Sequence, residues 1–414
     1  MINQQHIQEI TNKFQTPCWI YDAATIRQQI SRLRQFDVIR FAQKASSNIH
    51  ILQLMREQGV LVDSVSLGEI ERALAAGYQP DQNVHAAPIV FTADVLDRQT
   101  LARVTELNIP VNCGSPQMLQ QLGDAKQGHP VWLRINPGFG HGHSRKTNTG
   151  GEQSKHGIWH EQLDASLRII QATGLNLIGL HMHIGSGVDY AHLQSVCQAM
   201  QQQVRFVHAF GMDIGAISVG GGLSIPYREG EEEVDTAHYF DIWHAARLEI
   251  EQLLGHKVTM EIEPGRFLVA QSGVLVTELH AQKQVGNNFF ALVDAGFNDL
   301  ARPAMYGSYH RISAHAPDGS LRTGPCRPTV VAGPLCESGD VFTQIEGGEV
   351  VTQDLPVCDI GDLLVLHDTG AYGASMSSNY NSRPLIPEVL VDGEQVKLIR
   401  RRQTVQELIA LESI

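Results

Sequence analysis

Between residues 38 and 263, short runs of β-forming residues alternate with segments of helical periodicity, and this alternation limits the possible folds more than any other feature of the chain. The chain shows 8 such runs, beginning at Val38, Leu61, Ile89, Ile109, Val131, Leu175, Ala216 and Lys257. Most of them precede an amphipathic segment, such as 67–76 or 237–254. Eight β/α units predict a TIM-type (β/α)8 barrel, the α/β part of the fold. The fourth run is the weakest because Pro110 interrupts it.

After Arg266 the pattern changes to short β runs joined by Gly, Pro and Asp turns, at 274–279, 289–294, 329–332, 363–366, 388–391 and 397–400. We therefore expect an all-β C-terminal domain, a β-sandwich or barrel-like fold, to follow the barrel. Residues 19–22 precede the barrel without a helix partner, so they are expected to add a strand to this domain. The predicted domains are 1–23, 24–270 and 271–414. Residues 310–328 are expected to form an ordinary exposed excursion.

The composition of the 414-residue chain limits which kinds of partner and which cellular compartment are expected. A formal net charge of −13 gives no basic surface for nucleic acid and disfavours anionic membranes, so a small charged metabolite is the expected partner. The 6 cysteines include no C-x-x-C pair, which favours a reducing cytosol. The polar start of the chain has no signal-peptide core, and no run is long and apolar enough to span a bilayer. We expect a soluble cytoplasmic protein that uses neither nucleic acid nor a membrane.

A lysine ends the first run, in Asp37-Val-Ile-Arg-Phe-Ala-Gln-Lys44, just before the helix-start signal Ser46-Ser47-Asn48. The carboxyl ends of barrel strands carry the functional groups of such folds, and a desolvated lysine is nucleophilic enough to condense with an aldehyde. Alone, Lys44 would more simply be a surface side chain with its ammonium in water. Only the groups at the other strand ends can decide between these interpretations.

The sixth run ends in His181-Met-His183-Ile-Gly-Ser186-Gly, and strand alternation places both histidines on one face. Three interpretations remain open: a shared metal, buried histidines that make only structural hydrogen bonds, or an imidazole packed on a flat cofactor ring. The metal is the least supported, because no H-x-x-E-H motif or cluster of Cys and Asp accompanies the pair. The following Gly-Ser-Gly offers backbone N–H groups and a hydroxyl for an anion.

The seventh run ends in three glycines, Gly220, Gly221 and Gly222, which let the backbone approach a phosphate closely, although a glycine run can also be a plain turn. The absence of G-x-G-x-x-G argues against a dinucleotide fold. The eighth run ends in Glu261-Ile-Glu263-Pro-Gly-Arg266, where Glu263 could belong to a structural ion pair. A carboxylate there could instead keep a heteroaromatic nitrogen protonated.

Together these strand ends describe a pyridoxal phosphate site. Lys44 would bind the aldehyde, His183 would stack on the ring, and Glu263 would pair with the pyridine nitrogen. Ser186 and the three glycines would hold the phosphate.

At this point the chain resembles the fold type III pyridoxal phosphate-dependent decarboxylases over nearly its whole length. The matching stretches, in the same order, are 41–48, 63–70, 181–187, 220–222, 263–266, 294–307, 333–340 and 368–372. The resemblance implies a cofactor-binding barrel, a β domain, and a homodimer whose active sites are shared between subunits. The implied cofactor contacts are Lys44, His183, Ser186, Gly220, Gly221, Gly222, Glu263, Pro264, Gly265, Arg266 and Tyr372.

The same resemblance implies roles for residues beyond the barrel strands. Cys336 would return a proton to the decarboxylated carbon, where a cysteine could otherwise be only a small buried thiol. Glu337 would bind the distal ammonium of the substrate. The substrate's far carboxylate would be bound by Arg266, Arg302 and Tyr306, and Tyr372 would contact both the cofactor phosphate and the substrate.

Three features depart from the family pattern. Phe41-Ala-Gln-Lys-Ala-Ser46 replaces the frequent Tyr-Ala-x-Lys-Ala-Asn, and Lys155-His156-Gly157 replaces Lys-Phe-Gly. Neither change touches a proton-transfer group. The third is a Gly/His-rich segment at 138–151, within a 137–157 connection that is too long for an ordinary βα loop and suggests a lid.

Within the family, the motifs resemble most the members that decarboxylate meso-2,6-diaminopimelate to L-lysine and CO2, the last step of a lysine biosynthetic route. An ornithine, arginine or carboxynorspermidine decarboxylase is a rival, but those substrates need no clamp such as Arg302 with Tyr306. An amino-acid racemase is less favoured, because alanine racemases of this fold place an arginine where Glu263 stands. A catalytically inactive relative would have lost Lys44, the glycines or Cys336. A metal hydrolase would need further strand-end ligands.

Overall fold

The computed structural model describes every residue except 1, 81–82, 141–148, 184, 186 and 188. The chain forms two compact units. The barrel unit comprises Ile30–Ser224 and Glu233–Gly265, and the β unit comprises Met1–Gln29, Ile225–Glu232 and Arg266–Ile414. Helix α2 (Ala23–Ser31) carries the chain from the β unit into the barrel unit. The crossings near residues 29 and 265 lie a few residues from the predicted boundaries.

The barrel unit is a closed parallel barrel, which confirms the predicted fold. Its strands are β2 (Val38–Ala42), β3 (Leu61–Ser64), β4 (Ile89–Ala93), β5 (Val111–Cys113), β6 (Pro130–Asn136), β8 (Asn176–His181), β9 (Ala216–Ser218) and β10 (Thr259–Ile262). Each pairs in parallel with its neighbours, and the β10–β2 and β5–β6 pairings close the ring. The short β7 (Ile158–Trp159) adds to β6 outside the ring. Strand β5 begins directly after Pro110, as the interrupted pattern predicts.

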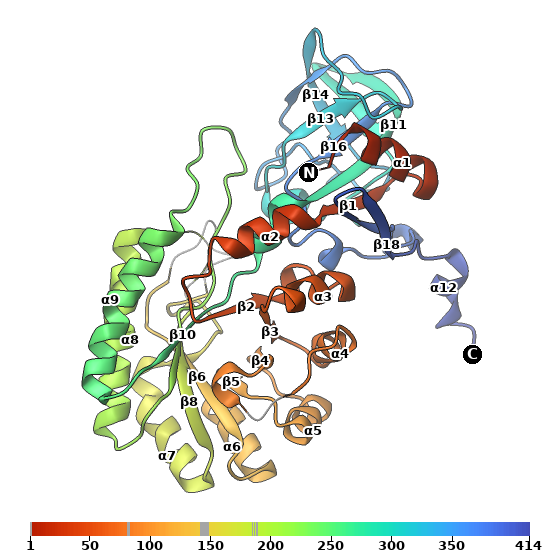
Figure 1. Cartoon of the computed structure of the whole chain (residues 1–414). Coiled ribbons are helices and arrows are strands. Elements are labelled where there is room, and N and C mark those ends of the chain that lie inside the picture. The colour runs from red at the N-terminus through yellow and green to blue at the C-terminus, as the bar shows by residue number, and fades with distance from the viewer. Residues whose placement is uncertain (1, 81–82, 141–148, 184, 186, 188) are drawn as a thin grey trace. The chain divides into compact units, whose positions relative to one another are not determined.

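Helices surround the barrel strands, with α8 and α9 side by side (Figure 1). They are α3 (Ile49–Glu57), α4 (Leu67–Ala75), α5 (Arg98–Leu107), α6 (Pro116–Ala125), α7 (Leu163–Thr173), α8 (Tyr190–Ala209) and α9 (Thr236–Leu254). Most begin at a side chain that accepts a hydrogen bond from the first turn, namely Asn48, Ser66, Asp97, Ser115, Asp189 and Asp235. Such a cap stabilises a helix by about 1 kcal/mol, so the polar residue before each helix fixes where the strand–helix loop ends.

The barrel interior holds a buried ion pair below its mouth. Arg40 of β2 donates to both carboxylate oxygens of Glu261 in β10, at 2.8 and 2.9 Å, and both side chains are 1% exposed. Arg40 also donates to the carbonyl of Ala87 at 2.8 Å. Glu261 is therefore the structural half of the Glu261/Glu263 pair, and Glu263 lies nearer the carboxyl ends of the strands.

The β unit is a mixed sheet into which the N-terminal strand inserts, as predicted. Its strands are β1 (Cys18–Asp22), β11 (Gly273–Val285), β12 (Asn288–Val293), β13 (Ile312–His315), β14 (Cys326–Ala332), β15 (Gln353–Pro356), β16 (Leu363–Leu366), β17 (Glu388–Asp392) and β18 (Gln395–Arg400). Strand β1 pairs antiparallel with β11 and parallel with β17. Its helices are α1 (Gln4–Phe14), α10 (Arg266–Val269), α11 (Arg302–Tyr306) and α12 (Val405–Ala410).

One part of the β unit contradicts a prediction from the sequence, and another part was not predicted. The prediction of an exposed excursion at 310–328 is wrong at its start, because His310 is buried and β13 pairs antiparallel with β16. Helix α1 was not anticipated; its buried Ile7 and Ile10 pack on a core shared by β1, β11, β16 and β17. The apolar residues on one face of α1 explain why the polar start of the chain folds against the sheet.

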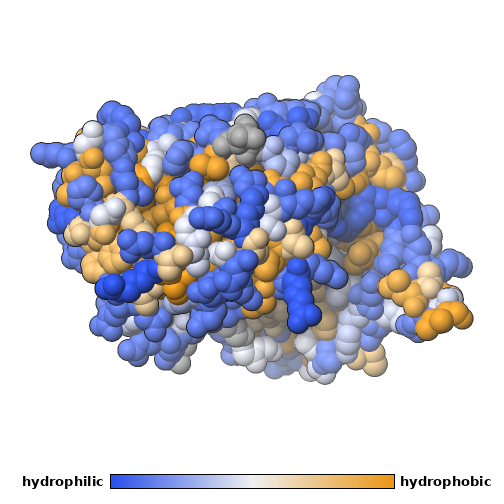
Figure 2. Space-filling model, turned by 90° about the horizontal axis from the view of Figure 1, so that it is seen from below, coloured by the Kyte–Doolittle hydropathy of each residue, from blue (hydrophilic) through white to orange (hydrophobic). Residues whose placement is uncertain are grey.

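On the face shown in Figure 2, hydrophilic residues are interleaved with apolar ones. Among the described helices, none combines the length and the apolar content that crossing a membrane requires.

Candidate active site

Lys44 lies in a single 3-10 turn, Gln43–Ala45, directly after β2. Its neighbour Gln43 is fully buried and donates to Ser64 Oγ at 2.6 Å and to the carbonyl of Glu69 at 3.1 Å, which anchors the turn. The Lys44 side chain itself is exposed at the end of the strand. Its charge acts on Asp63, Glu69 and His183. The amine is thus free to react while its backbone is held.

Glu263 follows β10, and a polar side chain lies against each of its carboxylate oxygens. Ser218 Oγ donates to Oε1 at 2.8 Å, and His181 Nε2 lies 3.1 Å from Oε2. Only 10% of the Glu263 side chain is exposed. Burial opposes its ionisation, but the interactions with His181 and Ser218 outweigh burial and hold the pKa of Glu263 below its usual range. The barrel therefore presents a stable carboxylate at this strand end.

His183 is fixed through the glycine turn of the neighbouring strand. The backbone N–H of Gly221 donates to His183 Nδ1 at 3.1 Å. Burial, with Arg134 and Lys44 nearby, places the pKa of His183 well below its usual value. The ring is therefore a neutral, flat surface with a defined orientation, which suits stacking on a heteroaromatic ring.

The three glycines after β9 have no room for side chains. A Cβ would lie 2.5 Å from the Met182 carbonyl oxygen at Gly220, 2.3 Å from the Glu263 carbonyl oxygen at Gly221, and 2.3 Å from the Gly185 carbonyl oxygen at Gly222. Two of their N–H groups are used internally, since Gly220 donates to Ser218 Oγ and Gly221 to His183. In the described part of the chain, the Gly222 N–H has no hydrogen-bond acceptor. Ser186 lies outside the described residues.

Pro264 and Gly265 join the Glu263 strand end to the Lys44 turn. The Pro264 carbonyl accepts a hydrogen bond from Ala42 N–H at 3.1 Å. A Cβ on Gly265 would lie 3.3 Å from Ala42 and from Ala45, so the bare backbone packs closely against this turn. These two residues support the site through the backbone.

Further buried charges surround the same strand ends. Burial and then the Glu263 charge raise the pKa of Asp63, at the end of β3, to about 7. Burial lowers the pKa of Arg134 in β6, against the attraction of Asp94, Glu263 and Asp63. His156, which departs from the family pattern, contacts Asp94 through Nδ1 and so ties residue 156 to the end of β4.

In the β unit, two guanidinium groups share one acceptor. Arg266 Nη1 and Arg302 Nη1 both donate to the hydroxyl of Tyr227, at 3.0 and 3.2 Å. Arg302 also donates to His310 Nε2 at 2.9 Å, and His310 in turn donates from Nδ1 to the carbonyl of His367. Burial, and then the charge of Arg302, lowers the pKa of His310 to about 3, so His310 is a neutral acceptor.

Two tyrosines lie near Arg266: Tyr306, predicted to bind the distal carboxylate with the two arginines, and Tyr372, predicted to contact the cofactor phosphate and the substrate. The Arg266 guanidinium carbon is 5.5 Å from the centre of the Tyr372 ring, and Tyr306 adds to the electrostatic environment of Arg266. Tyr372 has φ of 58°, a left-handed backbone that L-residues seldom adopt. The structure thus groups Arg266, Arg302, Tyr306 and Tyr372 within one unit.

Cys336 and Glu337 are exposed in a loop after β14. The Cys336 N–H donates to Asn381 Oδ1 at 2.9 Å, and the Leu335 N–H donates to the buried carboxyl of Asp340 at 2.7 Å. None of the contacts recorded for the described residues joins Cys336 or Glu337 to the two arginines. The loop is therefore held by its backbone, while the side chains of Cys336 and Glu337 are exposed.

Several groups at these sites escaped prediction because their partners are distant in the chain. They are Asn112, Asp63, Arg134, Tyr227, His310 and Asn381. Only Asp63 stood in a motif matched by the resemblance, and nothing in the local sequence marks the others.

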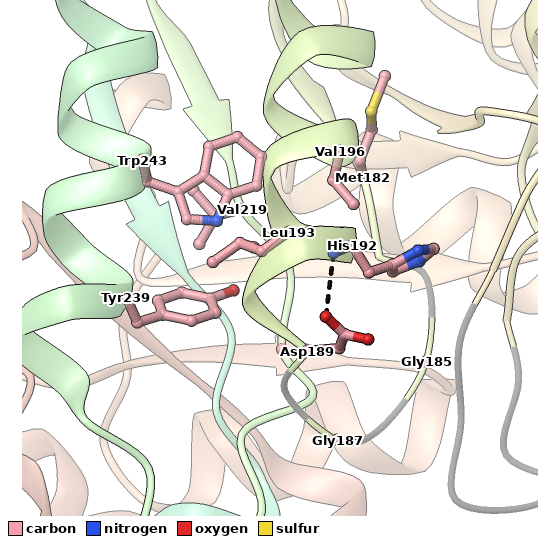
Figure 3. A pocket seen from close by; sticks show the side chains of 11 residues that line it. Met182, Gly185, Gly187, Asp189, His192, Leu193, Val196, Val219, Tyr239 and Trp243 are labelled. Atoms are coloured by element: carbon pink, nitrogen blue, oxygen red, sulfur yellow. Dashed lines mark hydrogen bonds between the residues drawn. The ribbon is translucent and has the colours of Figure 1, made fainter.

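The barrel residues fit the cofactor that the sequence predicts. Among the described residues, the Gly222 N–H has no acceptor and its backbone leaves no room for a Cβ, and no arginine or lysine pairs with the Glu263 carboxylate. A cavity of about 30 Å3 beside the glycine turns is lined by α8 and α9, where Tyr239 and Trp243 point toward Leu193 (Figure 3). This cavity has room for no more than about two waters, so it is too small to hold the cofactor.

Known proteins resemble this chain over nearly its whole length. The family model described as pyridoxal-dependent decarboxylase, pyridoxal binding domain, matches residues 23–270. The diaminopimelate decarboxylase of Escherichia coli (strain K12) is 67% identical over 412 residues, covering 99% of this chain and 97% of that protein. The diaminopimelate decarboxylase of Streptomyces coelicolor is 68% identical over 397 residues, covering 96% and 89%.

Solved structures agree with the sequence comparison. A crystal structure of a diaminopimelate decarboxylase, 67% identical, matches with a TM-score of 0.95 over 99% of this chain and 96% of that chain. The Helicobacter pylori diaminopimelate decarboxylase complexed with L-lysine is 30% identical and matches with a TM-score of 0.87 over 98% of both chains. The chain therefore belongs to the pyridoxal-dependent decarboxylases and, within them, to the diaminopimelate decarboxylase family.

Proposed function

We propose that the chain decarboxylates meso-2,6-diaminopimelate to L-lysine and CO2 with pyridoxal 5'-phosphate as its cofactor. The observation that carries the substrate assignment is the pairing of Arg266 and Arg302 on one neutral acceptor, the Tyr227 hydroxyl. Among the described residues, no carboxylate lies within ion-pair distance of either guanidinium. Adjacent cations without an anion are unfavourable, and a ligand carboxylate would relieve them through charge-assisted hydrogen bonds.

This clamp discriminates between the rival decarboxylases of the same fold. Diaminopimelate carries a second carboxylate, whereas ornithine and arginine end in a cation that two arginines would repel. The clamp would also fix which amino-acid end is presented to the cofactor, because the reacting bond must be oriented as well as bound. Tyr306 and Glu337 would complete recognition of the distal end.

Bound pyridoxal phosphate supplies an electron sink next to the α-carbon of the amino acid. Lys44 would hold the cofactor's aldehyde and give way to the substrate's amine. Glu263 would keep the proton on the pyridine nitrogen, and the neutral His183 ring would pack on the cofactor face. Gly220, Gly221 and Gly222, with Ser186, would surround the phosphate. Cys336 would return a proton to the carbon that has lost CO2.

The decisive experiment is a CO2-release assay with meso-diaminopimelate, its LL and DD isomers, ornithine and arginine. We expect turnover of the meso isomer to dominate; dominant ornithine or arginine turnover would overturn the assignment. Lys44→Ala should abolish both turnover and the visible absorbance of bound cofactor. A wild-type protein that binds pyridoxal phosphate but releases no CO2 would instead indicate the inactive, regulatory alternative.

The resemblance also supports an assembly and a cellular role. We infer a cytoplasmic homodimer whose active sites are shared between subunits, acting last in lysine biosynthesis without nucleic acid or membrane partners. The net charge of −13 supports the absence of a nucleic-acid partner.

Mixing inactive Lys44→Ala and Cys336→Ala proteins should restore part of the activity if each site draws these residues from different subunits. No recovery after verified subunit exchange would contradict shared sites.

A further inference from the structure

Glu263 stands at the end of a row of buried polar contacts that runs from β5 through β8 to the end of β10. Asn112 of β5 donates from Nδ2 to His181 Nδ1 at 2.8 Å, and His181 Nε2 lies 3.1 Å from Glu263 Oε2. Asn112 is 2% exposed and His181 is 1% exposed. The sequence left His181 open between a metal ligand and a structural residue, and its ring instead bridges an amide and a carboxylate.

The two neighbours of His181 define where its proton lies. A ring nitrogen at hydrogen-bond distance from a carboxylate oxygen must carry a hydrogen, because two acceptors would repel each other. The other nitrogen accepts from the Asn112 amide. An imidazole that carries its hydrogen on Nε2 and leaves Nδ1 bare fits both contacts, so the Asn112 amide favours the tautomer whose N–H faces Glu263.

The partners of Glu263 differ from those of Glu261, the carboxylate two residues before it. Glu261 is bonded at both oxygens by the cation Arg40, which neutralises it. Glu263 accepts a hydrogen bond from a hydroxyl and lies 3.1 Å from an imidazole nitrogen, and no arginine or lysine among the described residues forms an ion pair with it. The charge therefore remains available to a cationic partner, as a protonated pyridine would be.

The surroundings of Glu263 make these donors necessary. The charged and titratable groups that act on it are His181, His183, Asp63, Arg134 and Arg40. Asp63 and burial both favour the protonated acid, whereas donors on the carboxylate favour the anion. Without the His181 donor, the balance shifts toward a neutral carboxyl that cannot pair with a cation.

We propose that His181, oriented by Asn112, is a positioning residue that holds Glu263 as the ionised acceptor for the pyridine N–H of the cofactor. This inference rests on the proposed function and adds two residues to it. Neither His181 nor Asn112 needs to touch the substrate.

The test compares His181→Leu, which removes the donor, with His181→Gln, whose amide can place an N–H where imidazole Nε2 stood. The affinity of the apo chain for pyridoxal phosphate is measured by quenching of its tryptophan fluorescence. We expect His181→Leu to raise the dissociation constant by about ten- to a hundredfold, the effect of one charge-assisted hydrogen bond. His181→Gln should restore most of the affinity. Asn112→Leu keeps the imidazole but no longer selects its tautomer, so it should lower the cofactor affinity less than His181→Leu does.

Kinetics separate positioning from general damage. In His181→Leu the acid limb of the kcat profile should move to higher pH, because Glu263 takes up a proton more readily. KM for meso-diaminopimelate should stay near the wild-type value. His129→Gln is the matched control: His129 is also fully buried in the barrel unit but makes no side-chain contact with Glu263. It should change neither the affinity nor the pH profile.

Circular dichroism and thermal unfolding establish that each variant is folded before the comparison. A folded His181→Leu protein with wild-type cofactor affinity and pH profile would overturn the proposal. Equal losses in His181→Gln and His181→Leu would do the same. Because cofactor affinity does not depend on substrate identity, wild-type protein that fails to decarboxylate meso-diaminopimelate would refute the proposed function while leaving this comparison valid.

Discussion

The backbone N–H of Gly221 donates a hydrogen bond to Nδ1 of His183 at 3.1 Å. One residue of the glycine turn thus orients the ring expected to stack on the cofactor, while its neighbour Gly222 keeps an N–H for the phosphate. The two functions assigned separately to the sixth and seventh strand ends are physically linked. A change at Gly221 should therefore affect both the ring and the phosphate turn.

Gly221→Ala should weaken cofactor binding more than it weakens the fold. Its Cβ would lie 2.3 Å from the Glu263 carbonyl oxygen, so one of the two strand ends must move. We expect about 1–3 kcal/mol of destabilisation and a loss of cofactor affinity measured by fluorescence titration. Gly68→Ala, whose Cβ would meet nothing closer than Ser66 Oγ at 3.8 Å, is the control and should bind normally. Unchanged affinity in Gly221→Ala would contradict the linkage.

The barrel could be predicted because its information is local. A short apolar run indicates each strand, and the spacing of apolar residues together with a capping residue indicates each helix. All eight barrel strands therefore begin within two residues of the predicted starts. Position at a strand end then brought Lys44, His183, Glu263 and the glycines to the same edge of the barrel without knowledge of their contacts.

What the sequence did not reveal is the pairing of polar groups. Asn112 and His181 are 69 residues apart, and Tyr227 and Arg302 are 75 apart. A periodic pattern tells which residues face inward but not which donor meets which acceptor. His310 was missed for a related reason: its buried position depends on the pairing of β13 with β16, and β13 is too short to stand out.

Cys336→Ala should lower kcat for CO2 release by roughly 10²–10⁴ if its thiol is the proton donor. Cofactor affinity should be unchanged, because Cys336 is exposed and its backbone contact to Asn381 survives the substitution. Cys326→Ala is the matched control, since Cys326 is also a free, exposed cysteine of the β unit. Equal kcat in both variants would exclude Cys336 as the acid.

Arg302→Gln should raise KM for meso-diaminopimelate by about ten- to a hundredfold, because it would remove one of the two charged donors that we propose for the distal carboxylate. The fall in kcat should be smaller, since the reacting end lies elsewhere on the substrate. Arg228→Gln provides the comparison: Arg228 is exposed and stacks 4.1 Å from the centre of the Tyr309 ring. If steady-state kinetics give the same KM for the two variants, Arg302 does not bind the distal carboxylate.

Asp299→Asn should become more stabilising as pH rises. Asp299 is 1% exposed, and its Oδ1 has no hydrogen-bond partner among the described residues. Burial raises its pKa from 3.8 to about 7, so the native state binds this proton more tightly than the unfolded chain does. The stability that the proton provides is complete below the unfolded pKa and is lost as pH rises through the folded one.

An asparagine at position 299 does not titrate, so its contribution to stability does not depend on pH. The free energy of unfolding of the variant, measured by urea denaturation and taken relative to wild type, should therefore increase by roughly 2–4 kcal/mol between about pH 4 and 8. Parallel pH curves for the two proteins would show that Asp299 titrates alike in both states.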